Sequence, residues 1–292
     1  IRMIEWKVTA DYDSENNQSG SITIDIDGNI EKSASGWKIA GTDQNLVTKM
    51  TKTITVKNNS NNIKVWIKFT DRAGNTSEKE IVFSIDKTVP EITVDFDNNS
   101  YDSSFGNDSR YFKDKRTATI TVRERNFNQD NMKVTMSNTD GSVPAIGSWK
   151  EVRDKQNPDA STYTATVTFQ QDGDYTMYVE GMDLAGNKAN SVTVDPFTID
   201  LVQPEISISY DNMEAKNNNY YSEARTATIT IKEHNFETSR IQLDSSVSES
   251  KSNKVPTISN WTSNGDVHTA SITFDEDGLY SFAMNYTDKA GN

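Results

Sequence analysis

The stretch RTATITVRERNF, residues 116–127, returns almost unchanged as RTATITIKEHNF at residues 225–236. Its first half alternates Ala118, Ile120 and Val122 with threonines. A period of two is typical of a β-strand with one buried face, because successive side chains point to opposite sides of a strand. The stretch therefore predicts the same strand in two related modules.

The repeat continues downstream of this strand. TYTATVTFQQDGDYTMYVEGMDLAGN (162–187) returns as VHTASITFDEDGLYSFAMNYTDKAGN (267–292), and SVPAIGSW (142–149) returns as KVPTISNW (254–261). A fixed order of matching segments indicates tandem copies of one unit. Within the first copy the alternation predicts a second strand that buries Ala165, Val167 and Phe169.

A pentapeptide of the form D-x-A-G-N counts three modules, at residues 71–75, 183–187 and 288–292. The first module has the pentapeptide and the strand before it but not the RTATIT segment, so it is divergent. Proline interrupts sheet bonding, and it stands in the joints DKTVPEITV (86–94) and DLVQPEISI (200–208). We therefore predict three domains joined by semi-rigid linkers, and their ranges are 1–88, 89–202 and 203–292.

Short strands separated by turn signals, with no sustained helical spacing, predict an all-β chain of antiparallel sandwiches. Tyr175 and Tyr280 each follow Asp-Gly-x and precede a large apolar residue, Met177 or Phe282, by two positions. In immunoglobulin domains a tyrosine at this place bonds back to nearby backbone, and a cysteine two residues later enters the core. The pattern favours immunoglobulin-like sandwiches in an elongated rod. The alternative is an ordinary half-buried tyrosine in an unrelated sandwich.

Each D-x-A-G-N segment follows its strand at the end opposite the tyrosine, which predicts a hairpin turn into the last strand. Glycine accepts a positive φ there, and aspartate caps the turn through its side chain. Apolar strands follow the first two copies, whereas no residue follows 288–292. We therefore expect the third module to lack its last strand and to leave an unpaired sheet edge.

Composition excludes several classes of protein. The net charge of -13 argues against binding to nucleic acid, because phosphate contacts need clustered Lys and Arg. No apolar run of eighteen residues occurs, so we expect no membrane insertion. The chain has no cysteine, which favours a Gram-positive cell surface over a eukaryotic ectodomain if the protein is extracellular.

The order RTATITVRERNF, VP, W, TATVTF, DGDY and DLAGN resembles the bacterial immunoglobulin-like repeats of large cell-wall-anchored surface proteins in Gram-positive gut bacteria. The resemblance covers residues 89–292 well and 1–88 only through its second half. It implies an extracellular location at the cell wall and a role as an adhesin. Some members bind host immunoglobulin in a superantigen-like manner. The shared motif is a fold signature and carries no catalytic residue.

The residues needed for catalysis are sparse. The only histidines are His234 and His268, there is no cysteine, and no G-x-S-x-G elbow is present. His234 occupies the place of Arg125 in the preceding repeat, so that position accepts either side chain. We predict that the chain is not an enzyme and that it uses no cofactor.

Structural Ca²⁺ is the alternative to a chain without metal. Pairs of carboxylates flank the proline joints, Asp86 with Glu91 and Asp200 with Glu205, and would lie between domains. DIDGN (25–29) and DEDG (275–278) read as hairpin turns. A Lys–Asn isopeptide cross-link at Glu124–Asn126 or Glu233–Asn235 is a further alternative, although the two modules share no inward lysine.

Aromatic pairs give the remaining functional prediction. RYF (110–112) and NYY (219–221) precede the same strand in the two repeats, beside Asn-rich loops. Interfaces favour aromatic and arginine anchors, so the predicted partner-binding residues are Tyr111, Phe112, Tyr220 and Tyr221. Alternation turns one of each pair inward. The leading function is a monomeric binder of a host protein such as immunoglobulin. The alternatives are a passive stalk and an accessory segment of a larger secreted enzyme.

Overall fold

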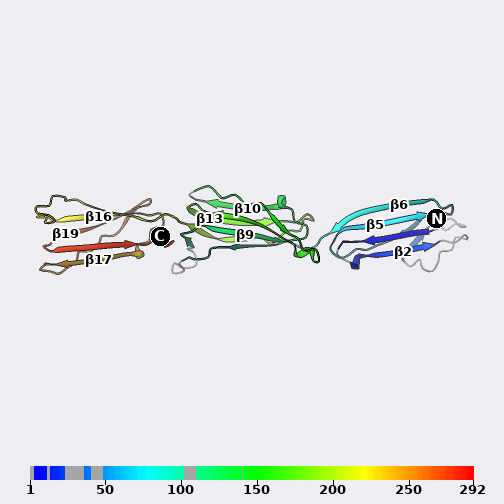
Figure 1. The fold of residues 1–292 in the computed structure, drawn as a ribbon, viewed down its shortest axis with the longest axis horizontal. Helices are drawn as coiled ribbons and strands as arrows, with labels where there is room; N and C mark the ends of the chain where they lie inside the picture. Colours follow the sequence, from blue (N-terminus) through cyan, green and yellow to red (C-terminus); the bar gives the residue numbers. More distant parts are fainter. Residues whose placement is uncertain (1–2, 12–13, 24–35, 41–48, 102–109, 140) are drawn as a thin grey trace.

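The computed structural model describes residues 3–11, 14–23, 36–40, 49–101, 110–139 and 141–292. The chain is all-β, as the sequence predicted. Its described strands form several sheets, in which every strand pairing but one is antiparallel, and short 3-10 turns lie between some of the strands. Figure 1 shows three groups of strands that follow one another in chain order. Among the described residues no helix is long and apolar enough to cross a bilayer.

The first group contains a four-stranded sheet of order β2-β1-β5-β6 and a separate hairpin of β3 and β4. Ile4, Val8, Ile22 and Ile63 are its buried apolar side chains. Its strands are β1 (Met3–Thr9), β2 (Gln18–Thr23), β3 (Trp37–Ala40), β4 (Lys49–Lys52), β5 (Ser60–Thr70) and β6 (Thr76–Ile85).

The second group is a sandwich of two four-stranded sheets, β11-β12-β9-β7 and β10-β13-β14-β8. Side chains from both sheets form one core. It contains five of the six residues that alternation had placed inside β9 and β12, and the sixth, Ala165, is also buried. The strands are β7 (Glu91–Phe96), β8 (Tyr111–Phe112), β9 (Arg116–Arg123), β10 (Met132–Asn138), β11 (Lys150–Val152), β12 (Thr162–Phe169), β13 (Gly173–Gly181) and β14 (Val192–Ile199).

The third group repeats this plan with fewer strands. A four-stranded sheet β15-β16-β19-β18 faces a two-stranded sheet of β17 and β20. In the part of the chain that the structure describes, β20 pairs only with β17, whereas its counterpart β13 also pairs with β14. The strands are β15 (Glu205–Tyr210), β16 (Arg225–Lys232), β17 (Ile241–Ser248), β18 (Thr262–Asn264), β19 (Val267–Phe274) and β20 (Leu279–Tyr286).

Both predicted corner tyrosines make the expected bond. The Tyr175 hydroxyl donates to the backbone oxygen of Gln171 at 2.9 Å, and Tyr280 donates to Glu276 at 3.0 Å. Met177 is buried, as predicted, whereas Phe282 is only half-buried. The third group is therefore less well buried at this place, where β20 pairs with β17 alone among the described strands.

The D-x-A-G-N segments adopt one turn three times. In each turn the backbone N–H of the aspartate donates to the backbone oxygen of the asparagine. The distances are 2.8, 3.1 and 3.2 Å in the first, second and third turns. The glycine has φ of 89°, 88° and 92°, where a side chain would strain the backbone. The first two turns join β5 to β6 and β13 to β14, which confirms the predicted hairpins.

Candidate functional site

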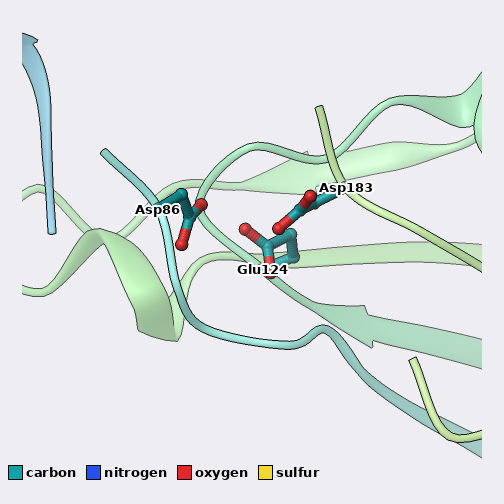
Figure 2. A group of neighbouring side chains, drawn as sticks. All are labelled: Asp86, Glu124 and Asp183. Atoms are coloured by element: carbon teal, nitrogen blue, oxygen red, sulfur yellow. The ribbon is translucent and has the colours of Figure 1, made fainter. Parts of the chain in front are cut away.

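Two clusters of carboxylates lie where one group of strands passes into the next. Asp86 follows β6, Glu124 follows β9, and Asp183 begins the turn between β13 and β14. One carboxylate oxygen from each lies within 4.8 Å of the others. Figure 2 shows the three side chains converging from different segments. Asp200, Glu233 and Asp288 form the same arrangement at the second junction.

Hydrogen bonds hold the linker aspartate Asp86 against the second group of strands. Asn126 Nδ2 donates to Asp86 Oδ2 at 2.6 Å, and Asn187 Nδ2 donates to the Asp86 backbone oxygen at 3.1 Å. Asn187 also donates from its backbone and side chain to Asp183, at 2.8 Å in each case. The asparagine of the pentapeptide therefore closes its own turn and binds the linker as well.

The second junction reproduces these bonds. Asn235 Nδ2 donates to Asp200 Oδ2 at 2.7 Å, and Asn292 Nδ2 donates to the Asp200 backbone oxygen at 2.8 Å. Asn292 closes its turn on Asp288 at 2.8 and 2.9 Å. An open cleft of about 520 Å³ beside this junction is lined in part by Asp200 and Glu233. The two junctions are thus built from matching residues of the repeat.

Burial gives the glutamates unusual electrostatics. Glu124 is 2% exposed and Glu233 is 5% exposed. Burial is the largest cause that raises the pKa of each glutamate. Together with the neighbouring aspartates, and against the backbone N–H donors that lower it, burial brings the pKa to about 7. One such donor is Asn126 N, 2.7 Å from Glu124 Oε1; Asn235 N is equally close to Glu233 Oε1. Burial likewise raises the pKa of Asp200.

The chelator-treated protein is expected to lose stability as the pH rises from 5 to 8. In this window the folded glutamates, with pKa about 7, still bind protons, whereas unfolded glutamate, with pKa 4.5, does not. The free energy of unfolding therefore falls with pH, by about 1–2 kcal/mol per glutamate after solvent screening is allowed for. Thermal unfolding measured across this range tests the slope, which the double variant E124Q/E233Q should flatten. A slope unchanged in that variant would assign the dependence to other groups.

The sequence analysis paired the linker aspartates Asp86 and Asp200 with Glu91 and Glu205 as possible Ca²⁺ ligands, but these two glutamates do not belong to the clusters. Glu91 lies 3.9 Å from Arg123, and Glu205 lies 3.2 Å from Lys232, so both face basic side chains on adjacent strands. Asn126 and Asn235, considered for a cross-link, donate to the linker aspartates instead. The predicted turn at 25–29 lies outside the described residues.

The two histidines lie in different environments. His268 is 6% exposed, its Nε2 lies 2.8 Å from the Glu233 backbone oxygen, and its ring stacks on Phe236 at 4.0 Å. In the preceding repeat Tyr163 stacks on Phe127 at 4.2 Å in the same way. Both repeats therefore stack a ring on the phenylalanine, although the ring is a phenol in one repeat and an imidazole in the other. His234 is exposed and lies 3.0 Å from Asp266.

The predicted partner-binding aromatics lie in different environments. Phe112 is fully buried in the core, so it has no surface to offer a partner. Tyr111 is half-buried, and Lys289 Nζ of the last turn lies 5.2 Å from its ring centre. Tyr221 is half-buried under the Arg225 guanidinium at 4.0 Å. Tyr220, 72% exposed, is the one of the four that projects into solvent.

No family model matches the chain, and no curated protein matches it significantly.

Proposed function

We propose that this chain is a non-catalytic part of a bacterial cell-surface protein, in which three tandem immunoglobulin-like sandwiches form an elongated rod. The domains span 1–88, 89–202 and 203–292. The observation that carries the proposal is the junction built twice from equivalent residues, with Asp86 or Asp200 held against the following module. Repeated, bonded junctions favour a fixed spacing between modules, which suits a molecule that extends from the cell wall.

The rod binds a host protein, and the resemblance to cell-wall-anchored repeats makes immunoglobulin the specific candidate. The net charge of -13 keeps such a molecule soluble and monomeric. A passive stalk is the second candidate, because the same junctions serve a spacer equally well. The accessory-segment alternative requires a catalytic domain elsewhere in the protein. Sequencing the complete gene would decide this question, and a sorting signal there would place the protein on the cell wall.

Immobilised chain is expected to bind immunoglobulin Fab in biolayer interferometry, with mucin and matrix proteins as the comparison ligands. If the exposed aromatic contributes, Tyr220→Ser should weaken binding about tenfold, the loss typical of an interface anchor. Val152→Ser is the matched control, because Val152 is 68% exposed on the other repeat. Absence of affinity for every ligand would overturn the binding role and leave the stalk.

A further inference from the structure

The first junction contains a buried oxygen atom without a partner. Glu124 is 2% exposed, and its Oε2 has no hydrogen-bond donor, although its Oε1 accepts from Asn126 N. Figure 2 shows the Glu124 carboxylate between those of Asp86 and Asp183. Buried polar atoms in native structures nearly always have partners, so an orphaned carboxylate oxygen indicates a missing positive or donating group.

The charge of the cluster points in the same direction. Three carboxylates converge there, and within the part of the chain that the structure describes none of them forms an ion pair with a basic side chain. The groups that contact them are asparagine amides and backbone N–H groups, which are neutral. Like charges buried together are costly unless a cation compensates them.

We propose that Asp86, Glu124 and Asp183 bind a Ca²⁺ ion at the first junction. Calcium–oxygen distances are about 2.3–2.6 Å, so two oxygens on one ion lie at most about 5 Å apart. The three oxygens of each junction satisfy this limit, since all lie within 4.8 Å of one another. Glu124 Oε2 accepts no hydrogen bond, and a carboxylate oxygen that accepts an asparagine bond keeps a further lone pair for the ion.

The ligand set selects the kind of ion. Each cluster contains only carboxylates, with neither histidine nor cysteine, which suits a hard cation rather than zinc or copper. Mg²⁺ keeps several waters and is usually held by one or two carboxylates, whereas Ca²⁺ accepts several protein carboxylates in flexible geometry. Three converging carboxylates therefore favour Ca²⁺.

The ion would couple neighbouring modules. Asp86 belongs to the linker after β6, whereas Glu124 and Asp183 belong to loops of the second sandwich. A shared ion adds a coordination bond across the same joint that the Asn126 and Asn187 side chains bridge. Without the ion this coordination bond is absent, and the joint is expected to loosen. The site rests on the junction residues alone, so a failure to bind any host protein would leave it standing.

Titration of the chelator-treated full chain with CaCl₂ in a calorimeter is expected to show a site at the first junction. Asp183→Asn should weaken binding at this site by at least about tenfold, a loss typical even of groups outside the coordination shell. Glu124→Gln is the second variant at the first junction, because it removes the orphaned charge with little change of shape. Circular dichroism confirms that each variant folds.

Asp71→Asn is the matched control. It removes the same charge from the same pentapeptide in the first module. Among the described residues, Asp71 bonds only within its turn and belongs to neither cluster. Ca²⁺ binding at the first junction should therefore remain unchanged in this variant. Three outcomes would overturn the proposal: no heat of binding up to millimolar Ca²⁺, equal losses in D71N and D183N, or Mg²⁺ binding as tightly as Ca²⁺. Limited proteolysis is the second measurement, in which Ca²⁺ is expected to protect the 86–90 linker from cleavage.

Discussion

Replacing Phe169 by alanine is expected to destabilise the second sandwich by about 3–5 kcal/mol, the usual cost of removing a fully buried aromatic ring. Phe169 is 0% exposed at the end of β12. Its ring meets Tyr175 at 4.9 Å and Phe197 at 5.0 Å, both edge to face. Since these two rings come from β13 and β14 of the opposite sheet, the substitution would open a cavity between the layers.

Phe274→Ala is the matched control, because Phe274 occupies the same place in β19 but is only half-buried. Its aromatic partners are Tyr280 at 5.0 Å and Phe282 at 5.8 Å, and the described residues include no counterpart of Phe197. The expected cost is about half that of Phe169→Ala. Denaturant unfolding followed by Trp149 or Trp261 in single-tryptophan variants reports on each sandwich separately. Equal losses would show that the two cores are equally well packed.

The cores were accessible to sequence reasoning because their signal is local. A period of two within β9 named Ala118, Ile120 and Val122, and the structure buries all three completely. The corner tyrosine likewise depends on a bond that spans four residues, Tyr175 to Gln171. Both features can therefore be predicted from a short segment of sequence alone.

The junction clusters were missed because their parts are remote in sequence. Asp86 is 40 residues from Asn126 and 101 residues from Asn187, the asparagines that bind it. A signal was nonetheless present. The linker aspartate, the E-x-N-F segment and the pentapeptide each occur at both junctions in the same order. Turn geometry explains only the repetition of the pentapeptide. The repetition of the linker aspartate and the E-x-N-F segment with it indicates that the three segments come together in the fold.

The aromatic pairs show how one missing neighbour changes a residue's environment. Phe112 is buried because β8 pairs with β14, Phe112 opposite Ile199. Tyr221 holds the equivalent place in the third module, where the described chain contains no counterpart of β14. The partial exposure of Tyr221 therefore follows from which strands the module contains. The identity of the two adjacent aromatic residues does not by itself predict whether the second of them is buried, as Phe112 is, or half-buried, as Tyr221 is.

A designed extension that copies residues 188–200 behind Asn292 is expected to stabilise the third sandwich by about 2–4 kcal/mol. The added strand would pair with β20 as β14 pairs with β13, where Phe197 lies opposite Tyr175. Fully burying one phenylalanine or isoleucine contributes about 1.5–3 kcal/mol, from which the cost of ordering the added chain is subtracted. Half-buried Phe282 would become a core residue like its counterpart Met177.

The same extension carrying proline in place of the copied Val194 is the control, because proline removes a ladder hydrogen bond and is poorly tolerated inside a sheet. Unfolding followed at Trp261 gives the stability. The part of the acrylamide quenching of tyrosine fluorescence that is lost in Tyr221→Phe gives the exposure of Tyr221. Tyr221 should become protected with the first extension only, since β8 and β14 pair in parallel beside Phe112. Equal stability with both extensions would mean that the edge of β20 does not accept a strand. In that case the thin core of the third sandwich would have to arise from its own side chains, chiefly the half-buried Phe274 and Met284.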